Sequence, residues 1–168
     1  MPLSMYQASV PVFTQMLTAL SAVLGKAEAQ CRSEGHDTAE LIGARLAPDM
    51  FPLSRQVQIA TDHAKGAAAR LSGREVPKFE DNETTFDDLK ERIARTMTFI
   101  SSVEVGEMDG SEDRDVTLSL RGQSRTFTGQ HYLLHMAMPN FYFHVTTAYG
   151  ILRQNGINLG KTDFLGVS

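Results

Sequence analysis

Four long stretches of the chain repeat an apolar residue at alternating spacings of three and four, and this pattern constrains the fold more than any other feature. Such a stripe is the buried face of an amphipathic helix, and its heptad-like spacing is typical of helices that pack almost parallel. The expected helices cover residues 4–34, 53–71, 86–103 and 130–154. Together they predict an all-α four-helix bundle. Cys31 continues the first stripe, so we expect it in the core and not as a nucleophile.

Capping and proline signals mark several of the helix boundaries. Asp37 is a good N-cap for a short helical stretch over residues 38–46, and Thr85 followed by Asp88 resembles a capping box. Pro139 lies inside the last helix, where it is expected to introduce a kink, because proline cannot donate a backbone hydrogen bond.

The period of the apolar pattern changes from helical to two near residue 116. Val116, Leu118 and Leu120 alternate with polar residues, and a turn at residues 121–124 precedes a second polar–apolar run that begins at Arg125. This pattern predicts a β-hairpin inserted between the third and fourth long helices. Residues 157–168 are expected to form an irregular tail.

Composition and charge exclude several classes of protein. A chain of 168 residues is long enough for a single domain, expected over residues 1–168. The formal net charge of −4 argues against a generic nucleic-acid binder, and the single cysteine excludes an internal disulfide framework and a cysteine-rich zinc site. There is no unbroken run of 18 apolar residues, which predicts no membrane span, and the N-terminus lacks the features of a signal peptide. We therefore expect a cytoplasmic protein.

Two polar residues of the second long helix lie within or beside its apolar stripe. At about 100° per residue, His63 lies about 60° from the stripe centre at Ala60, and Gln56 lies about 40° away on the same side. Buried polar groups need hydrogen-bond partners, so a partner on another helix is expected. His36, in contrast, lies in a glycine-containing connection and is expected to be a solvated loop residue.

The last helix offers histidines on two flanks. His144 lies about 60° from the stripe centre at Phe141, and Asn140 is on the same side. His131 and His135 lie on the opposite, less buried flank together with Tyr149, which is also a candidate pocket residue. The four-residue spacing of His131 and His135 is by itself weak evidence for a metal site.

The sequence therefore favours a shared pocket of Gln56, His63, Asn140 and His144. Two imidazoles and an amide oxygen are a small ligand set, which water or a carboxylate such as Asp62 would have to complete. Nitrogen-rich sites with open positions suit zinc, nickel or iron. The alternative is that these side chains form a buried hydrogen-bond network with no metal. Phosphate-binding loops, nucleophile elbows and cysteine–histidine signatures do not appear.

Several segments resemble the family known as domain of unknown function 1993. The resemblance rests on PNFYFHVTTAYGILR (139–153), followed by NG (155–156), on LGKTDFLG (159–166), on LSRQVQIATDHAKG (53–66) and on SMY (4–6). That family is similar to the DinB/YfiT-like group of small four-helix bundles, which are often dimeric.

The resemblance implies a metal site and, in some members, thiol chemistry. Many members bind a divalent metal through three histidines, one on the second helix and two on the fourth, and some transfer or isomerise substrates with a low-molecular-weight thiol. His63 and His144 match two of these ligands, whereas the third position falls on Asn140, a weaker ligand. We expect a DinB-like homodimer with a weak or remnant metal site. The alternatives are a metal-dependent thiol-linked transferase or isomerase, and a dimeric module that binds a small ligand.

Overall fold

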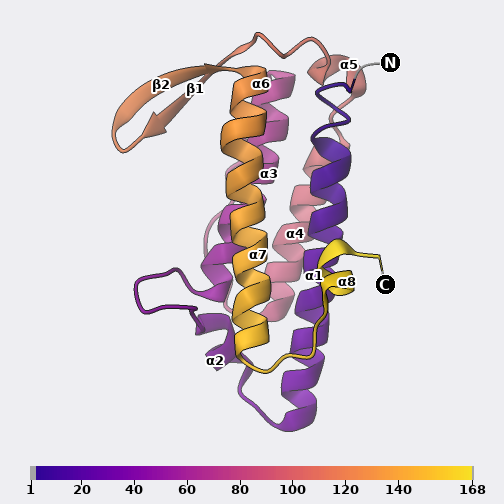
Figure 1. Cartoon of the computed structure of the whole chain (residues 1–168), viewed down its shortest axis with the longest axis vertical. Helices are drawn as coiled ribbons and strands as arrows, with labels where there is room; N and C mark the ends of the chain where they lie inside the picture. The colour runs from indigo at the N-terminus through magenta and orange to yellow at the C-terminus, as the bar shows by residue number, and fades with distance from the viewer. Residues whose placement is uncertain (1–2, 168) are drawn as a thin grey trace.

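The longest elements of the computed structural model, which describes residues 3–167, are four helices that run along its long axis (Figure 1). They are α1 (Val10–Glu34), α3 (Leu53–Ser72), α4 (Phe86–Ser101) and α7 (Met138–Gln154). α3 packs against both α7 and α4, and α1 packs against α4 and α7. The prediction of a mostly helical fold with one small hairpin is confirmed. Residues 1–2 and 168 of the expected domain lie outside the described part of the chain.

The core between these helices combines aromatic rings with very small side chains. Phe13 of α1 meets Phe141 of α7 edge to face, with ring centres 4.9 Å apart. On α3 the residues that face the interior include Ala60, Ala64 and Ala67, all fully buried. Their small size lets α7 approach α3 closely, which brings polar side chains of the two helices within reach of one another.

The helix α1 is long and apolar enough to cross a membrane by length and composition alone. Half of its most apolar window is buried inside the structure, however, and Phe13, Leu17 and Leu24 are fully buried there. Cys31 is 4% exposed and belongs to the same buried face. These buried side chains indicate that α1 is a core helix of the fold.

The first helix starts later than the sequence pattern predicts. Residues 5–9 form turns, and α1 begins at Val10 with Pro11 in its second position. Pro11 has no N–H group, so it interrupts helical hydrogen bonding on its N-terminal side but is tolerated within a first turn. The hydroxyl of Ser9 donates to the carbonyl of Met5 at 2.6 Å and stabilises the turn that precedes α1.

Short helices lie between and after the long ones. α2 (Thr38–Gly43) is capped by Asp37, as predicted, but ends before residue 46, and α5 (Val105–Met108) follows α4. α4 has the predicted capping box of Thr85 and Asp88 but ends before residue 103. The expected irregular tail contains α8 (Lys161–Leu165), which packs against α1. The carboxylate of Asp163 accepts from the Gly160 N–H at 2.8 Å and stabilises the start of α8.

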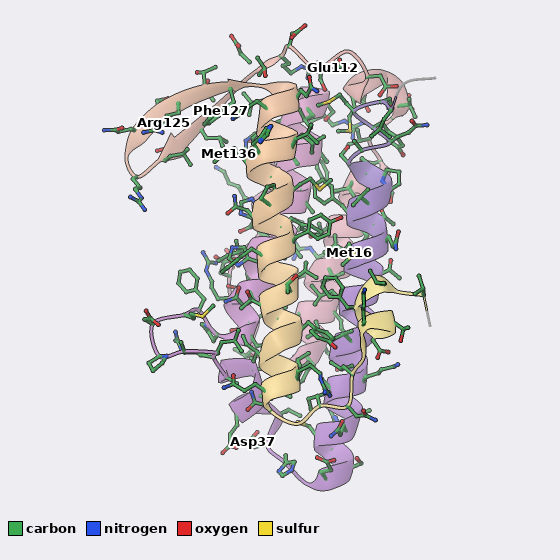
Figure 2. All side chains as sticks on the ribbon, in the orientation of Figure 1. Met16, Asp37, Glu112, Arg125, Phe127 and Met136 are labelled. Atoms are coloured by element: carbon green, nitrogen blue, oxygen red, sulfur yellow. The ribbon has the colours of Figure 1, made fainter. Side chains whose placement is uncertain are left out.

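The predicted hairpin is present, with a tighter turn. Strands β1 (Asp115–Leu120) and β2 (Gln123–Thr128) pair antiparallel, and Leu120 lies opposite Gln123. The turn is therefore only Arg121 and Gly122, both with positive φ (51° and 77°), as in a type I′ turn. The hairpin extends away from the long helices, with Arg125 near its far end (Figure 2).

The proline in the last helix is preceded by a π-helix, not by a regular α-helix. After the short helix α6 (Gly129–His131), the π-helix η1 (Tyr132–Ala137) leads into α7. The N–H of Met138 donates to the carbonyl of Leu133, five residues back. Pro139 cannot donate to the carbonyl of His135, and the wider turn accommodates this loss.

Candidate functional site

His144 of α7 is held by a hydrogen bond across the interface with α3. Its Nδ1 lies 2.7 Å from Oε1 of Gln56, and both side chains are at least nine-tenths buried. Nε2 of Gln56 in turn donates to the backbone carbonyl of Phe51 at 3.0 Å. The alanine-lined contact between the two helices leaves room for this polar pair within the apolar interior.

These contacts fix the tautomer of His144. Because the Phe51 carbonyl can only accept, the amide nitrogen of Gln56 must face it, and the amide oxygen faces the imidazole. Nδ1 of His144 therefore carries the proton. Burial, then the neighbouring His63 and Arg55, lower the pKa of His144 to about 4. At neutral pH the ring is uncharged, and its Nε2 has a free lone pair.

The ring of His63 on α3 lies beside the ring of His144. Their centres are 5.9 Å apart and their planes differ by 14°. Burial also lowers the pKa of His63, opposed by Asp62 and reinforced by Arg70. The structure thus brings together the two histidines that the helical angles place at the edges of their stripes, and both are neutral at physiological pH.

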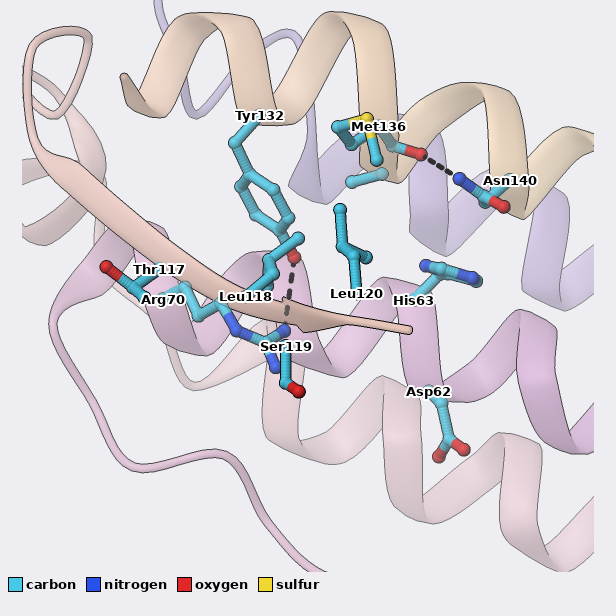
Figure 3. Close-up of a pocket in the computed structure, with 11 residues that line it drawn as sticks. Asp62, His63, Arg70, Thr117, Leu118, Ser119, Leu120, Tyr132, Met136 and Asn140 are labelled. Atoms are coloured by element: carbon cyan, nitrogen blue, oxygen red, sulfur yellow. Dashed lines mark hydrogen bonds between the residues drawn. The ribbon is translucent and has the colours of Figure 1, made fainter. Parts of the chain in front are cut away.

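Asn140 is one turn before His144 and near His63. Its Nδ2 donates to the carbonyl of Met136 at 2.6 Å, at the end of the π-helix. In Figure 3 the ring of His63 points toward Asn140, while Asp62 points away from both. The bond to Met136 occupies the amide nitrogen and leaves the amide oxygen of Asn140 as an available acceptor.

His63 and Asn140 border a cavity of about 530 Å³ between α3, the strand β1, η1 and the start of α7, whereas Gln56 and His144 are not among the residues that line it (Figure 3). The hairpin forms one wall of it. Its lining combines polar groups from the helices with apolar side chains from β1 and η1: Asp62, His63, Arg70, Thr117, Leu118, Ser119, Leu120, Tyr132, Met136, Ala137 and Asn140.

The carboxylate of Asp62 is not free to complete a metal site. Its Oδ1 accepts from Lys65 at 2.6 Å and from Arg92 at 2.8 Å. Within residues 3–167 no group of three or more histidine, cysteine, aspartate or glutamate side chains is placed to hold a metal ion. Asp62 is thus part of a charge network with Arg92 and Lys65.

The distance between the centres of the two imidazole rings would allow them to share one divalent ion. Ligand nitrogens lie ~2.0–2.1 Å from zinc, so two rings that share one ion have centres at most about 6 Å apart. The observed 5.9 Å falls within this limit. The bond from His144 to Gln56 is also the kind of outer contact that orients a metal-binding histidine. The donor set would be two imidazoles and the amide oxygen of Asn140.

The other candidate residues lie elsewhere. Tyr149 packs against Phe164 of α8, with ring centres 5.7 Å apart, and is not among the residues that line the cavity. Its assignment to the pocket is not supported by this position. The rings of His131 and His135 are both exposed and stack on one another at 4.6 Å, and Phe127 of the hairpin stacks on His131. His36 is exposed, as predicted.

Sequence reasoning missed Arg70 and Tyr132. They line the cavity at the end away from His63, and Nη1 of Arg70 donates to the hydroxyl of Tyr132 at 3.1 Å. The sequence feature that points to Arg70 is Gly66, an interior helical glycine four residues before it.

Comparisons with known proteins agree with this architecture. Residues 5–165 match the family described as domain of unknown function (DUF1993). A crystal structure of a DinB family member protein from Shewanella denitrificans is similar to the chain at 42% sequence identity and a TM-score of 0.89. The match covers 97% of this chain and 92% of that one. No curated protein matches the sequence.

Proposed function

The chain belongs to the DUF1993 family, and on that premise we propose that it is a DinB-like four-helix-bundle protein that binds a divalent transition metal weakly. The ligands are His63, His144 and Asn140, and the remaining coordination positions face the cavity. When bound, such an ion would polarise an oxygen or sulfur atom of a ligand in the cavity.

The observation that carries the proposal is the hydrogen bond between His144 and Gln56. It places the proton on Nδ1 and leaves Nε2 unprotonated beside His63. A metal requires a deprotonated ring nitrogen, and the lowered pKa values of both histidines keep their rings neutral. No proton has to be displaced from these rings at physiological pH.

The charge balance explains why binding is expected to be weak. All three proposed ligands are neutral, and the nearest carboxylate, Asp62, is paired with Arg92 and Lys65. Imidazole nitrogen suits zinc, nickel and iron better than an amide oxygen does. The amide of Asn140 is therefore the limiting ligand.

The proposed weakness of Asn140 as a metal ligand can be tested by replacing it. In calorimetric titrations with Zn²⁺ and Ni²⁺, Asn140→His is expected to bind at least about tenfold more tightly than the wild type, a difference of ~1.4 kcal/mol. His144→Ala is expected to abolish binding. His131→Ala, which alters an exposed histidine outside the cavity, is the matched control and is expected to bind like the wild type.

The proposal fails if folded Asn140→His binds these metals no more tightly than the wild type. Binding that is lost in His131→Ala but retained in His144→Ala would move the metal to the exposed pair. A thiol-linked transferase or isomerase activity depends on the metal, so it would be sought only in a metal-loaded protein.

A second candidate function is the binding of a small molecule without metal. The cavity of about 530 Å³ is within the usual range for small-molecule sites, and it combines apolar walls with a few polar groups. The inference below concerns the chemistry of that ligand.

A further inference from the structure

We propose that Arg70 and Tyr132 form an anion-binding subsite in the cavity, which takes the carboxylate of a small organic acid. The subsite lies at the opposite end of the cavity from His63. It does not rest on the proposed metal site, because none of the metal ligands takes part in it.

Arg70 is half-buried without an acidic partner among the described residues, whereas Arg95 and Arg153 of the other long helices also lack one but are exposed. Arg55, Arg74 and Arg92 each form an ion pair with a carboxylate. Among the described residues, Arg70 contacts no carboxylate, although it is half-buried. Its hydrogen bond goes to the hydroxyl of Tyr132, and its guanidinium carbon lies 5.8 Å from the centre of that ring. A half-buried guanidinium that pairs with no carboxylate of the protein can bind the anionic group of a ligand.

Gly66 makes this placement of Arg70 possible. A Cβ atom at position 66 would lie 2.4 Å from Nη1 of Arg70, so any other residue there would displace the guanidinium. Gly66 lies in the interior of α3, where glycine is unfavourable compared with alanine, and three alanines follow it directly. The position of the Arg70 side chain supplies a physical reason for glycine at this point.

The hydroxyl of Tyr132 is a second hydrogen-bond donor beside the guanidinium of Arg70. Its hydroxyl oxygen accepts from Arg70, and within residues 3–167 no acceptor takes the hydroxyl proton. The side chain is 3% exposed, and burial raises the pKa of Tyr132, which keeps the proton in place. The Tyr132 hydroxyl and the Arg70 guanidinium lie next to one another at one end of the cavity (Figure 3). A carboxylate that enters there can accept from Tyr132 with one oxygen and from Arg70 with the other.

The walls between the two ends of the cavity indicate the rest of the ligand. His63 and Arg70 are seven residues apart on α3, about two turns, which separates them by roughly 10 Å along the helix. The lining between them includes the apolar side chains of Leu118 and Leu120 from β1 and of Met136 from η1. The site therefore fits a carboxylate joined to a short apolar chain.

The surrounding charge favours an acid over an amine. Arg121 and Arg125 lie at the far end of the hairpin, beside the strand that forms the cavity wall. The carboxylate in the lining, Asp62, is paired with Lys65 and Arg92. Within the lining, Arg70 is thus the charged group without a counter-charge, although the whole chain has a net charge of −4.

Hexanoate and hexanamide form a matched pair of probes, because they share a chain and differ in charge. In NMR titrations of the full chain in EDTA, hexanoate is expected to bind at least tenfold more tightly than hexanamide. Arg70→Gln is expected to weaken hexanoate binding at least tenfold, and Tyr132→Phe at least threefold. Gly66→Ala is expected to weaken it as well, because it displaces Arg70 without removing its charge.

Arg95→Gln is the control, since Arg95 also lies over an aromatic ring, that of Phe79, but outside this cavity. It is expected to bind hexanoate within twofold of the wild type. Equal binding of the two probes, no saturable shift with hexanoate, or wild-type affinity in Arg70→Gln with an unchanged unfolding midpoint would each overturn the proposal. His144→Ala is expected to retain hexanoate binding even if it loses metal, so this subsite and the metal site fail independently.

Discussion

The buried histidine at position 144 is expected to make the stability of the protein depend on pH in a defined window. Its pKa is about 4 in the folded chain, against an ordinary value of 6.5. The unfolded chain therefore takes up a proton first as the pH falls, and protonation favours unfolding. The contribution of His144 to stability is fully present above pH 6.5 and is lost as the pH falls through this range toward 4.

The magnitude follows from the size of this difference. Each pKa unit corresponds to about 1.4 kcal/mol, so the complete loss well below pH 4 is about 3.5 kcal/mol, of which about 2.5 kcal/mol is already lost at pH 4.5. His144 is only 9% exposed, so solvent screening reduces this figure little. The physical cause is that a charged imidazole would be buried beside His63 with Gln56 as its polar partner.

Urea unfolding of the metal-free protein in EDTA, at pH 8 and at pH 4.5, measures this loss. His144→Gln removes the titrating group, and the difference between the two pH values is expected to shrink by about 2.5 kcal/mol relative to the wild type. His36→Gln, which alters an exposed histidine, is the matched control for replacing a histidine by glutamine. If His144→Gln and the wild type lose the same stability between these pH values, within about 0.5 kcal/mol, the assignment of a buried neutral imidazole is wrong.

Two further predictions concern stability and assembly. Arg92 is 1% exposed and pairs with Asp62, Asp81 and Glu83, so Arg92→Met is expected to cost about 3–5 kcal/mol in urea unfolding, against less than about 1 kcal/mol for Arg95→Met on the same helix. A loss below 1 kcal/mol for Arg92→Met would contradict this. Phe143 is 55% exposed, and exposed apolar groups often mark interfaces, so we expect a homodimer by sedimentation at micromolar concentration. A single 18.5 kDa species would exclude it.

The helical elements could be predicted because their signals are local. The stripe spacings, the capping box at Thr85 and the two-residue alternation around Val116 each depend on neighbours in the sequence. The errors arose where a contact or a backbone constraint outweighed the pattern. Pro11 delays the start of α1, and the docking of residues 161–165 on α1 makes a helix of a stretch with no apolar stripe of its own.

The approach of His63 and His144 could be anticipated because both angles were measured within regular helices. Each histidine is placed relative to Ala60 or Phe141 on the same uninterrupted helix, so the angle holds in the structure. The hairpin wall of the cavity could not be anticipated in this way. Its position depends on η1, whose π-helical turns alter the rotation of every residue between Tyr132 and Ala137. No pattern in the sequence predicts this π-helix.

Two features of the structure bear on the glycine at position 66: the packing of α3 against α7 and the placement of Arg70. Close packing against α7 explains the small residues of α3, but it does not distinguish Gly66 from the alanines that follow it. Side chains of a helix, however, point back over the turn that precedes them. Arg70 therefore covers the backbone of Gly66, and only glycine leaves room for its guanidinium there. An arginine four residues after a helical glycine is thus a sequence signal for a guanidinium held flat against its own helix, where it can serve a ligand in the adjoining cavity.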